Sequence, residues 1–390
     1  MGLVVAAIVG EYGESYRYDF YKLKSLMTQE IRNLGVLGVT GLLLCIAAIA
    51  SIETYYFAAQ WGVVSLMVWL YVWWQCWHQR DLNKPSENAT LYHDLGPANR
   101  LTLLRGFLIA MTAGFILQQY THPASLWIPA FLYSVAAILD RLDGFVARRT
   151  QRASLLGSSL DNTYDALGLF VAPVLAVNLG KVHWSYLILS IAFYIFQIGL
   201  ASRKARGLPI FDLAPSKLRR TLAGFQMGYV AIALWPPFSA NVTSAVGVGF
   251  MIPVLLGFLV DWRIVSGRIN ARSTKKLFSV LQLNSQHYLQ PGLRVVFLAA
   301  SLPLLSSLTL TPLTLLLLCI CSLLILLGCG ARIAAVGVLL LLALQPMQQD
   351  FSPMFIVFLF STCWIALLGS GRFSLWQGDD IWVERHDGAI

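Results

Sequence analysis

The chain has 390 residues, of which 57% are hydrophobic and 12% are charged, and its formal net charge at pH 7 is +9. Soluble globular proteins carry about 25% charged residues, so this composition excludes a soluble enzyme. It also excludes a disordered chain and a collagen-like fibre. The six cysteines form no C-x-x-C pair, which argues against a disulfide scaffold and a structural zinc site.

The apolar residues occur in long runs, and a run of about 18 or more predicts a membrane-spanning helix. The predicted spans cover residues 36–53, 57–78, 99–119, 125–142, 158–178, 183–202, 221–237, 244–262, 293–309, 312–329, 331–346 and 352–370. The sequence therefore predicts an all-α integral membrane protein with about twelve transmembrane helices.

The distribution of basic residues predicts the orientation of these spans. With a cytoplasmic N-terminus, the outward loops fall near residues 54, 122, 181, 240, 311 and 350. Of the 28 Lys and Arg residues, only Lys181 lies in those loops, as the positive-inside rule requires. Basic loops that face an anionic leaflet account for the net charge without nucleic acid as a partner. We expect both termini in the cytoplasm and the chain in a bacterial inner membrane.

Four segments follow from this pattern. Residues 1–95 contain a polar N-terminal segment and two spans, and residues 96–262 contain six spans and most of the notable polar residues. Residues 263–291 form a basic amphipathic linker that we expect on the membrane surface. Its basic and apolar residues are Arg263, Arg268, Arg272, Lys275 and Lys276, and Ile264, Ile269, Leu277 and Leu281. Residues 292–390 form a four-span module whose role the sequence does not indicate.

Four aspartates lie in one short window at predicted span ends. Asp140 and Asp143 are three residues apart, so they share a helix face at the end of the fourth span. Gly157, Asp161 and Asp165 are spaced by four and form a stripe at the start of the fifth span. Charges near membrane depth are costly and indicate function. Antiparallel packing of the two helices would bring all four carboxylates together.

Four adjacent carboxylates repel one another, and a divalent cation removes that cost. Oxygen ligands without a nearby His or Cys favour magnesium, calcium or manganese. Because magnesium completes its shell with substrate phosphates, the predicted substrate is a phosphate ester of nucleotide type. The small residues Gly144, Ala147 and Gly157 allow close approach, and Arg148 can pair with a phosphate. The alternative, a set of solvated helix-end charges, suits Arg149 and Arg152.

The window resembles the signature of the CDP-alcohol phosphotransferase (phosphatidyltransferase) family, D-x2-D-G-x2-A-R-x8-G-x3-D-x3-D. All eight specified positions match: Asp140, Asp143, Gly144, Ala147, Arg148, Gly157, Asp161 and Asp165. The resemblance covers residues 96–262, under half of the chain, and implies a six-helix core flanked by two N-terminal and four C-terminal spans.

The resemblance also implies roles for these residues. Asp140, Asp143, Asp161 and Asp165 would ligate two magnesium or manganese ions, and Asp165 would also act as general base. Gly144, Ala147, Arg148 and Gly157 would contact the CDP moiety. The acceptor hydroxyl would attack the β-phosphorus of a CDP-alcohol, and CMP would leave. This chemistry agrees with the residues, because metals stabilise charge on a leaving phosphate and a carboxylate can accept the hydroxyl proton.

Two further groups of residues extend the predicted site. Asn99, Thr102 and Arg105 follow Pro97 in a pattern similar to the P-x-x-x-T-x-x-R helix start of family members, with one extra residue after the proline. We expect them to contact the nucleotide, although Pro97 and Asn99 also fit an ordinary helix start. The second group comprises Arg203, Arg206, Lys217 and Arg220, which would suit a phosphorylated acceptor. The alternative for these four is membrane topology alone.

The predicted function is a phospholipid-synthesising transfer from CDP-diacylglycerol to an acceptor such as glycerol 3-phosphate or inositol phosphate. One alternative is a CDP-choline or CDP-ethanolamine type phosphotransferase that acts on diacylglycerol. Another is a membrane transporter or channel, because twelve spans with acidic residues also suit a cation pathway. The active site would face the cytoplasm. Expected partners are a CDP-alcohol, the lipid bilayer and a second copy of the chain. Residues 292–390 faintly resemble DoxX-like membrane proteins.

Overall fold

The structure is a computed structural model that describes residues 2–213, 217–269, 283–307, 310–345 and 352–379, with the side chains of residues 2–24, 217, 220 and 305–307 excepted. Within these residues the chain forms twelve α-helices and no β-strand, so the predicted all-α fold is confirmed. Several predicted residues of the 263–291 linker, namely Arg272, Lys275, Lys276, Leu277 and Leu281, lie outside the described residues.

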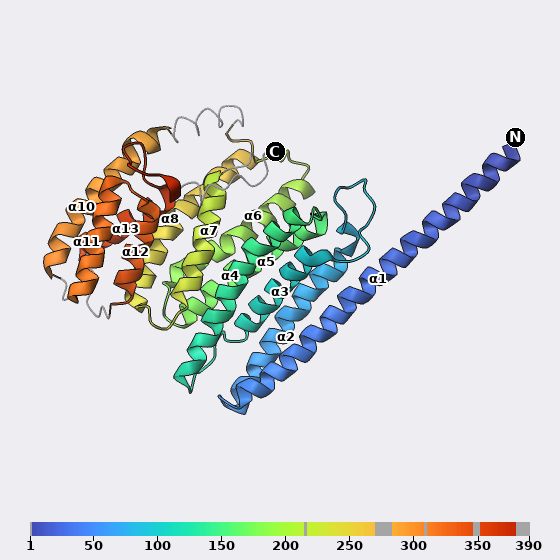
Figure 1. Ribbon diagram of the computed structural model, residues 1–390, viewed down its shortest axis with the longest axis horizontal. Helices are drawn as coiled ribbons and strands as arrows, with labels where there is room; N and C mark the ends of the chain where they lie inside the picture. The colour runs from blue at the N-terminus through green and yellow to red at the C-terminus, as the bar shows by residue number, and fades with distance from the viewer. Residues whose placement is uncertain (1, 214–216, 270–282, 308–309, 346–351, 380–390) are drawn as a thin grey trace. The chain divides into compact units, whose positions relative to one another are not determined.

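Each predicted span overlaps one helix (Figure 1). The helices are α1 (Gly2–Ala50), α2 (Tyr55–His78), α3 (Gly96–Ala113), α4 (Trp127–Arg149), α5 (Leu155–Asn178), α6 (Leu187–Ala205), α7 (Lys217–Ala233), α8 (Ala240–Val265), α10 (Gln290–Ser307), α11 (Pro312–Leu327), α12 (Ala331–Ala343) and α13 (Pro353–Leu368). Among the described residues, five segments are long and apolar enough to cross a membrane: Ser25–Ala50, Tyr55–His78, Pro123–Arg149, Trp184–Ala205 and Ala240–Val265. Shorter apolar helices accompany them, and the count of twelve spans stays a prediction.

The chain divides into two compact units, Met1–Leu175 and Ala176–Ile390. In the first unit α1 packs against α2, α2 against α3, and α3 against α4. Figure 1 shows α1 and α2 side by side as an antiparallel pair. The first unit contains all four aspartates of the predicted site, whereas the four predicted acceptor residues belong to the second unit.

Tryptophan side chains of α2 pack against a glycine-containing face of α1. The Trp69 indole donates a hydrogen bond to the carbonyl of Gly35 (3.2 Å), and the Trp73 indole donates one to the carbonyl of Ile31 (2.9 Å). A Cβ atom at Gly38 would lie 2.3 Å from the Trp69 ring. Small residues let membrane helices approach closely, and here they admit whole indole rings between α1 and α2.

The turn between α1 and α2 is tied to the loop that precedes α4. Glu53 is 7% exposed and accepts hydrogen bonds from the backbone N–H groups of Thr121 and His122 and from the Thr121 hydroxyl. The carboxylate therefore fixes one end of the α1–α2 pair.

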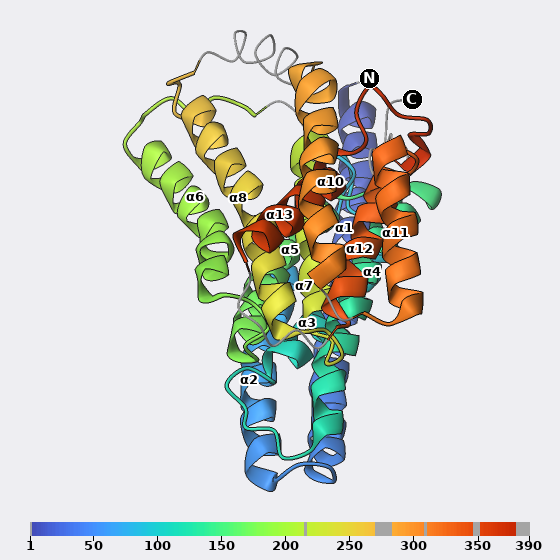
Figure 2. The same cartoon turned by 90° about the vertical axis from the view of Figure 1, so that its left-hand side faces the viewer.

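In the second unit α13 packs against α8, α10 and α12 (Figure 2). Two buried arginines of this unit donate hydrogen bonds to backbone carbonyls at or near helix C-termini. Arg332 donates to the carbonyls of Ala366, Leu367 and Leu368 at the end of α13. Arg294 donates to the carbonyls of Leu326 and Phe373. Apart from that of Phe373, which lies in the segment after α13, these are carbonyls that a helix end leaves without intrahelical partners.

We predict that Gly38→Ala destabilises the protein by about 1–3 kcal/mol, because the new methyl group overlaps the buried Trp69 ring. Gly257→Ala is the matched control, since a Cβ atom at this helical position meets nothing within 4 Å. Thermal unfolding of both variants in detergent checks the difference. Equal unfolding temperatures for Gly38→Ala and Gly257→Ala would contradict the packing described above.

Candidate active site

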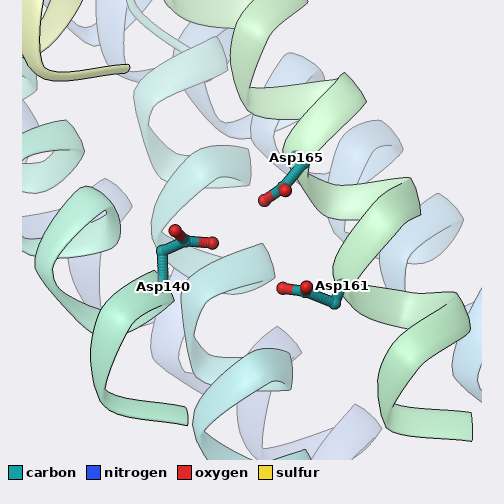
Figure 3. Close-up of side chains that lie close together, drawn as sticks. All are labelled: Asp140, Asp161 and Asp165. Atoms are coloured by element: carbon teal, nitrogen blue, oxygen red, sulfur yellow. The ribbon is translucent and has the colours of Figure 1, made fainter. Parts of the chain in front are cut away.

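Three carboxylates from α4 and α5 converge. One oxygen each of Asp140, Asp161 and Asp165 lies within 4.8 Å of the others. Figure 3 shows the three side chains pointing toward one another, Asp140 from one helix and the other two from its neighbour. The structure thus brings together three of the four aspartates that the sequence places on two helical faces.

Helix α5 presents its aspartates because the preceding positions are buried. Leu156, Leu160 and Tyr164 are completely buried at a spacing of four residues, which turns Asp161 and Asp165 toward the site. The Tyr164 hydroxyl donates a 2.8 Å hydrogen bond to the carbonyl of Val72 on α2. This bond and the apolar stripe fix the rotation of α5.

Asp143 lies deeper than the other three aspartates and is held by α3. It is 5% exposed and continues the buried stripe of α4. Its carboxylate accepts hydrogen bonds from the Thr102 hydroxyl (2.8 Å) and from the Gly144 backbone N–H (2.6 Å). Thr102, predicted as a nucleotide contact, therefore has a protein partner within the motif.

Arg105 of α3 lies among all four carboxylates and is only 2% exposed. Its Nη1 atom bonds to Asp140 and lies 3.1 Å from Asp161 and 4.0 Å from Asp143. Its Nη2 atom lies 3.0 Å from Asp165 and also donates to the Asp161 carbonyl. One guanidinium against four carboxylates leaves a formal excess of three negative charges around a buried arginine, with Asp161 and Asp165 partly exposed.

The position of Arg105 is the feature that the sequence reasoning missed. We expect it to contact the nucleotide, which stays a prediction, and the structure places its guanidinium against the aspartates. One feature of the sequence could have indicated this contact. Arg105 lies three residues after Thr102, so both residues lie on one face of α3. That face is the one that meets α4 and α5.

Asn99 and Gly157, both predicted to contact substrate, touch each other. The Asn99 amide is 4% exposed and donates to Asn83 Oδ1, the Leu95 carbonyl and Ser154 Oγ. A Cβ atom at Gly157 would lie 2.5 Å from Asn99 Oδ1. The absence of a side chain at Gly157 is therefore explained by contact with Asn99.

The other predicted CDP contacts lie along α4 after Asp143. Gly144 and Ala147 are half-buried and Arg148 is exposed. The Arg148 guanidinium lies over Gly144, 3.4 Å from where a Cβ atom would be. This leaves a basic group one helical turn from the acidic cluster, and the contact with CDP stays a prediction.

The predicted acceptor residues lie in the second unit. Arg203 donates to the carbonyls of Pro209 and Ser266, and Arg206 is exposed at the end of α6. The side chains of Lys217 and Arg220 lie outside the described part of the chain. A role for these four residues in acceptor binding stays a prediction.

The donor set fits a hard divalent cation. Asp140, Asp161 and Asp165 offer oxygen atoms only, at a spacing that one ion can bridge, and neither His nor Cys of the described residues joins this group. Such a set suits magnesium or manganese rather than zinc. The excess negative charge beside Arg105 also favours a cation.

Comparison with known proteins agrees with this geometry. Residues 96–273 match the family described as CDP-alcohol phosphatidyltransferase. A "CDP-diacylglycerol--glycerol-3-phosphate 3-phosphatidyltransferase" of Pectobacterium atrosepticum is 34% identical over 86 residues, which cover 21% of this chain and 46% of that protein. A protein of the same name from Cereibacter sphaeroides is 29% identical over 137 residues, which cover 34% of this chain and 61% of that protein. The chain thus spans about half to three fifths of these relatives. No solved structure shows a significant match.

We predict that Arg105→Met destabilises the metal-free protein by about 3–5 kcal/mol, because four carboxylates lose their buried counter-charge. Manganese should restore more stability to this variant than it adds to the wild type. Arg100→Met is the control on the same helix, since Arg100 is half exposed and pairs with Glu30 at the surface. Thermal unfolding with EDTA and with manganese checks both statements, and equal losses in the two variants would contradict them.

We further predict that Gly157→Ala destabilises the protein by about 1–3 kcal/mol through its overlap with Asn99. In the double variant, Asn99→Ala should remove part of that cost because the overlapping oxygen is gone. A double-mutant cycle of unfolding free energies measures this coupling. Strictly additive losses would mean that the two residues do not press on each other.

Proposed function

We propose that this chain is an integral membrane protein that transfers a phosphatidyl group from CDP-diacylglycerol to an acceptor alcohol and releases CMP. The match of residues 96–273 to the CDP-alcohol phosphatidyltransferase family supports this proposal. The observation that carries the proposal is the convergence of Asp140, Asp161 and Asp165 within 4.8 Å. These three residues belong to a complete eight-position motif. The family match supports the enzyme over a transporter or channel.

In this proposal the four aspartates hold two divalent ions, magnesium or manganese. When bound, such ions supply positive charge for the pyrophosphate and the departing CMP. Asp143 is held in place by Thr102 and Gly144, and Arg105 keeps the remaining carboxylates close together. The chain thereby presents a preorganised set of oxygen ligands, which is what a metal site requires.

Asp165 is the proposed general base. Its carboxylate takes the proton of the acceptor hydroxyl while the hydroxyl oxygen bonds to the β-phosphorus of the CDP-alcohol. The bond from that phosphorus to the oxygen of CMP breaks, and CMP leaves with the electron pair. Arg148, Gly144, Ala147 and Gly157 contact the CDP moiety, with the guanidinium of Arg148 pairing with a phosphate.

The proposed acceptor is glycerol 3-phosphate. Both curated relatives carry the name of a glycerol-3-phosphate 3-phosphatidyltransferase. The basic residues Arg203, Arg206, Lys217 and Arg220 would suit a phosphate-bearing acceptor such as this one or inositol phosphate. We propose that the site and both termini face the cytoplasm of a bacterium, because the basic loops lie on that side in the predicted topology.

The test is CMP release by the purified protein in micelles that contain CDP-diacylglycerol and magnesium. We expect release with glycerol 3-phosphate, and little with inositol phosphate, inositol or serine. Asp161→Asn and Asp165→Asn should each reduce release by about 10²-fold or more. Asp212→Asn changes an exposed aspartate of the second unit and is the control.

Three results would contradict the proposal in different ways. Unchanged CMP release in both site variants would remove the aspartates from the reaction. Release with inositol phosphate alone would show that the proposed acceptor is wrong, whereas the proposed reaction class would stand. Transfer from CDP-choline or CDP-ethanolamine to diacylglycerol would replace CDP-diacylglycerol as the donor.

A further inference from the structure

A loop that precedes the family-matched segment packs onto the start of α5. We propose that residues 79–95 position the first turns of α5, and with them Asp161 and Asp165, and that Asn83 is the central positioning residue of this loop. The inference rests on the proposed function of the aspartates. It assigns a role to a part of residues 1–95, which precede the family match that begins at residue 96.

Asn83 is buried at the point where the loop leaves α2. Its side chain is completely inaccessible, and its amide donates a 2.8 Å hydrogen bond to the Asp94 carbonyl, which closes the loop. Its Oδ1 atom accepts from the Asn99 amide at 3.1 Å. A buried side chain whose amide nitrogen and oxygen are both hydrogen-bonded holds its partners in one arrangement.

From Asn99 the hydrogen bonds continue to the motif. The Asn99 amide donates to Ser154 Oγ at 3.1 Å, and Ser154 Oγ accepts from the Gly157 backbone N–H at 3.0 Å. Gly157 lies one helical turn before Asp161. A continuous chain of hydrogen bonds therefore links Asn83 to the helix that carries two of the aspartates.

Backbone and surface contacts of the same loop support this chain. The Lys84 carbonyl accepts from the Leu155 N–H at 2.9 Å, and so satisfies one of the N–H groups that the start of α5 leaves free. Gln79 accepts from the Ser159 hydroxyl at 2.5 Å. Several independent contacts thus join residues 79–95 to the first turns of α5.

Arg152, just before α5, adds an ion pair to this interface. Its guanidinium bonds to Asp94 and lies 5.0 Å from the centre of the Tyr92 ring. The hydrogen bond from Arg152 lowers the pKa of Asp94, so the pair is charged at neutral pH. Arg152, which the sequence reasoning assigned to solvated charge, is therefore part of the contact that orients α5.

These contacts determine how precisely Asp161 and Asp165 are oriented. Ligands of a metal site are oriented by the residues behind them, and loss of such a residue costs about 10–100-fold in metal affinity. Only a short turn separates α4 from α5, and its residue Gln151 adopts a φ of 53°. External contacts from residues 79–95 therefore have a direct effect on the direction in which α5 begins.

The experiment compares Asn83→Ala with Glu53→Gln in the full-length protein. Glu53 is similarly buried and fixes the opposite end of the same α1–α2 pair, so its variant controls for general loss of stability. Arg152→Met, at a partly exposed position, is a second test variant that keeps an apolar side chain beside Tyr92. The readouts are hydrogen–deuterium exchange of residues 155–165 and manganese affinity from electron paramagnetic resonance titration.

We expect faster exchange at residues 155–161 and about 10-fold or weaker manganese binding in Asn83→Ala, with a smaller change of the same sign in Arg152→Met. Glu53→Gln should match the wild type in both. Unchanged exchange in Asn83→Ala and Arg152→Met, or an equal change in Glu53→Gln, would overturn the inference. Exchange is measured without substrate, so a wild type that releases no CMP would refute the proposed function and leave this test intact.

Discussion

Electrostatic repulsion among four carboxylates is the constraint on which the first unit depends. Asp140, Asp143, Asp161 and Asp165 come from two helices, and one buried arginine of a third helix binds them all. Separating these helices would leave the buried Arg105 without its counter-charges, which is costly. The three helices are therefore held together by the charges that form the site, and the remaining negative charge is what a divalent cation would neutralise.

The aspartate cluster could be predicted because it depends on local periodicity. Spacings of three and four residues place side chains on one helical face whatever the rest of the fold does. The all-α class was predictable for the same reason, since long apolar runs are a local property. The position of Arg105 was not predictable, because it depends on which face of α3 meets α4, and Arg105 and Asp140 are 35 positions apart.

The polar residues outside the motif illustrate the same limit. Arg152, expected as a solvated charge, pairs with Asp94 in the structure. Asn99 donates to Asn83 and Ser154 at the interface of residues 79–95 with α5, and its contact with the nucleotide stays a prediction. In the second unit, Gly328 and Gly330 adopt left-handed backbone conformations in the turn before Arg332. In a membrane protein with few charges, most buried polar groups satisfy backbone or ionic partners, and only their convergence indicates catalysis.

The central claim is that the aspartate cluster binds a divalent ion that in turn binds the donor phosphates. Electron–nuclear double resonance of manganese in the wild-type protein, with CDP-diacylglycerol added, tests this claim most directly. The account predicts a phosphorus coupling to the bound ion that disappears in Asp161→Asn. A spectrum of free aqueous manganese in the wild type, or a phosphorus coupling that persists in Asp161→Asn, would contradict it.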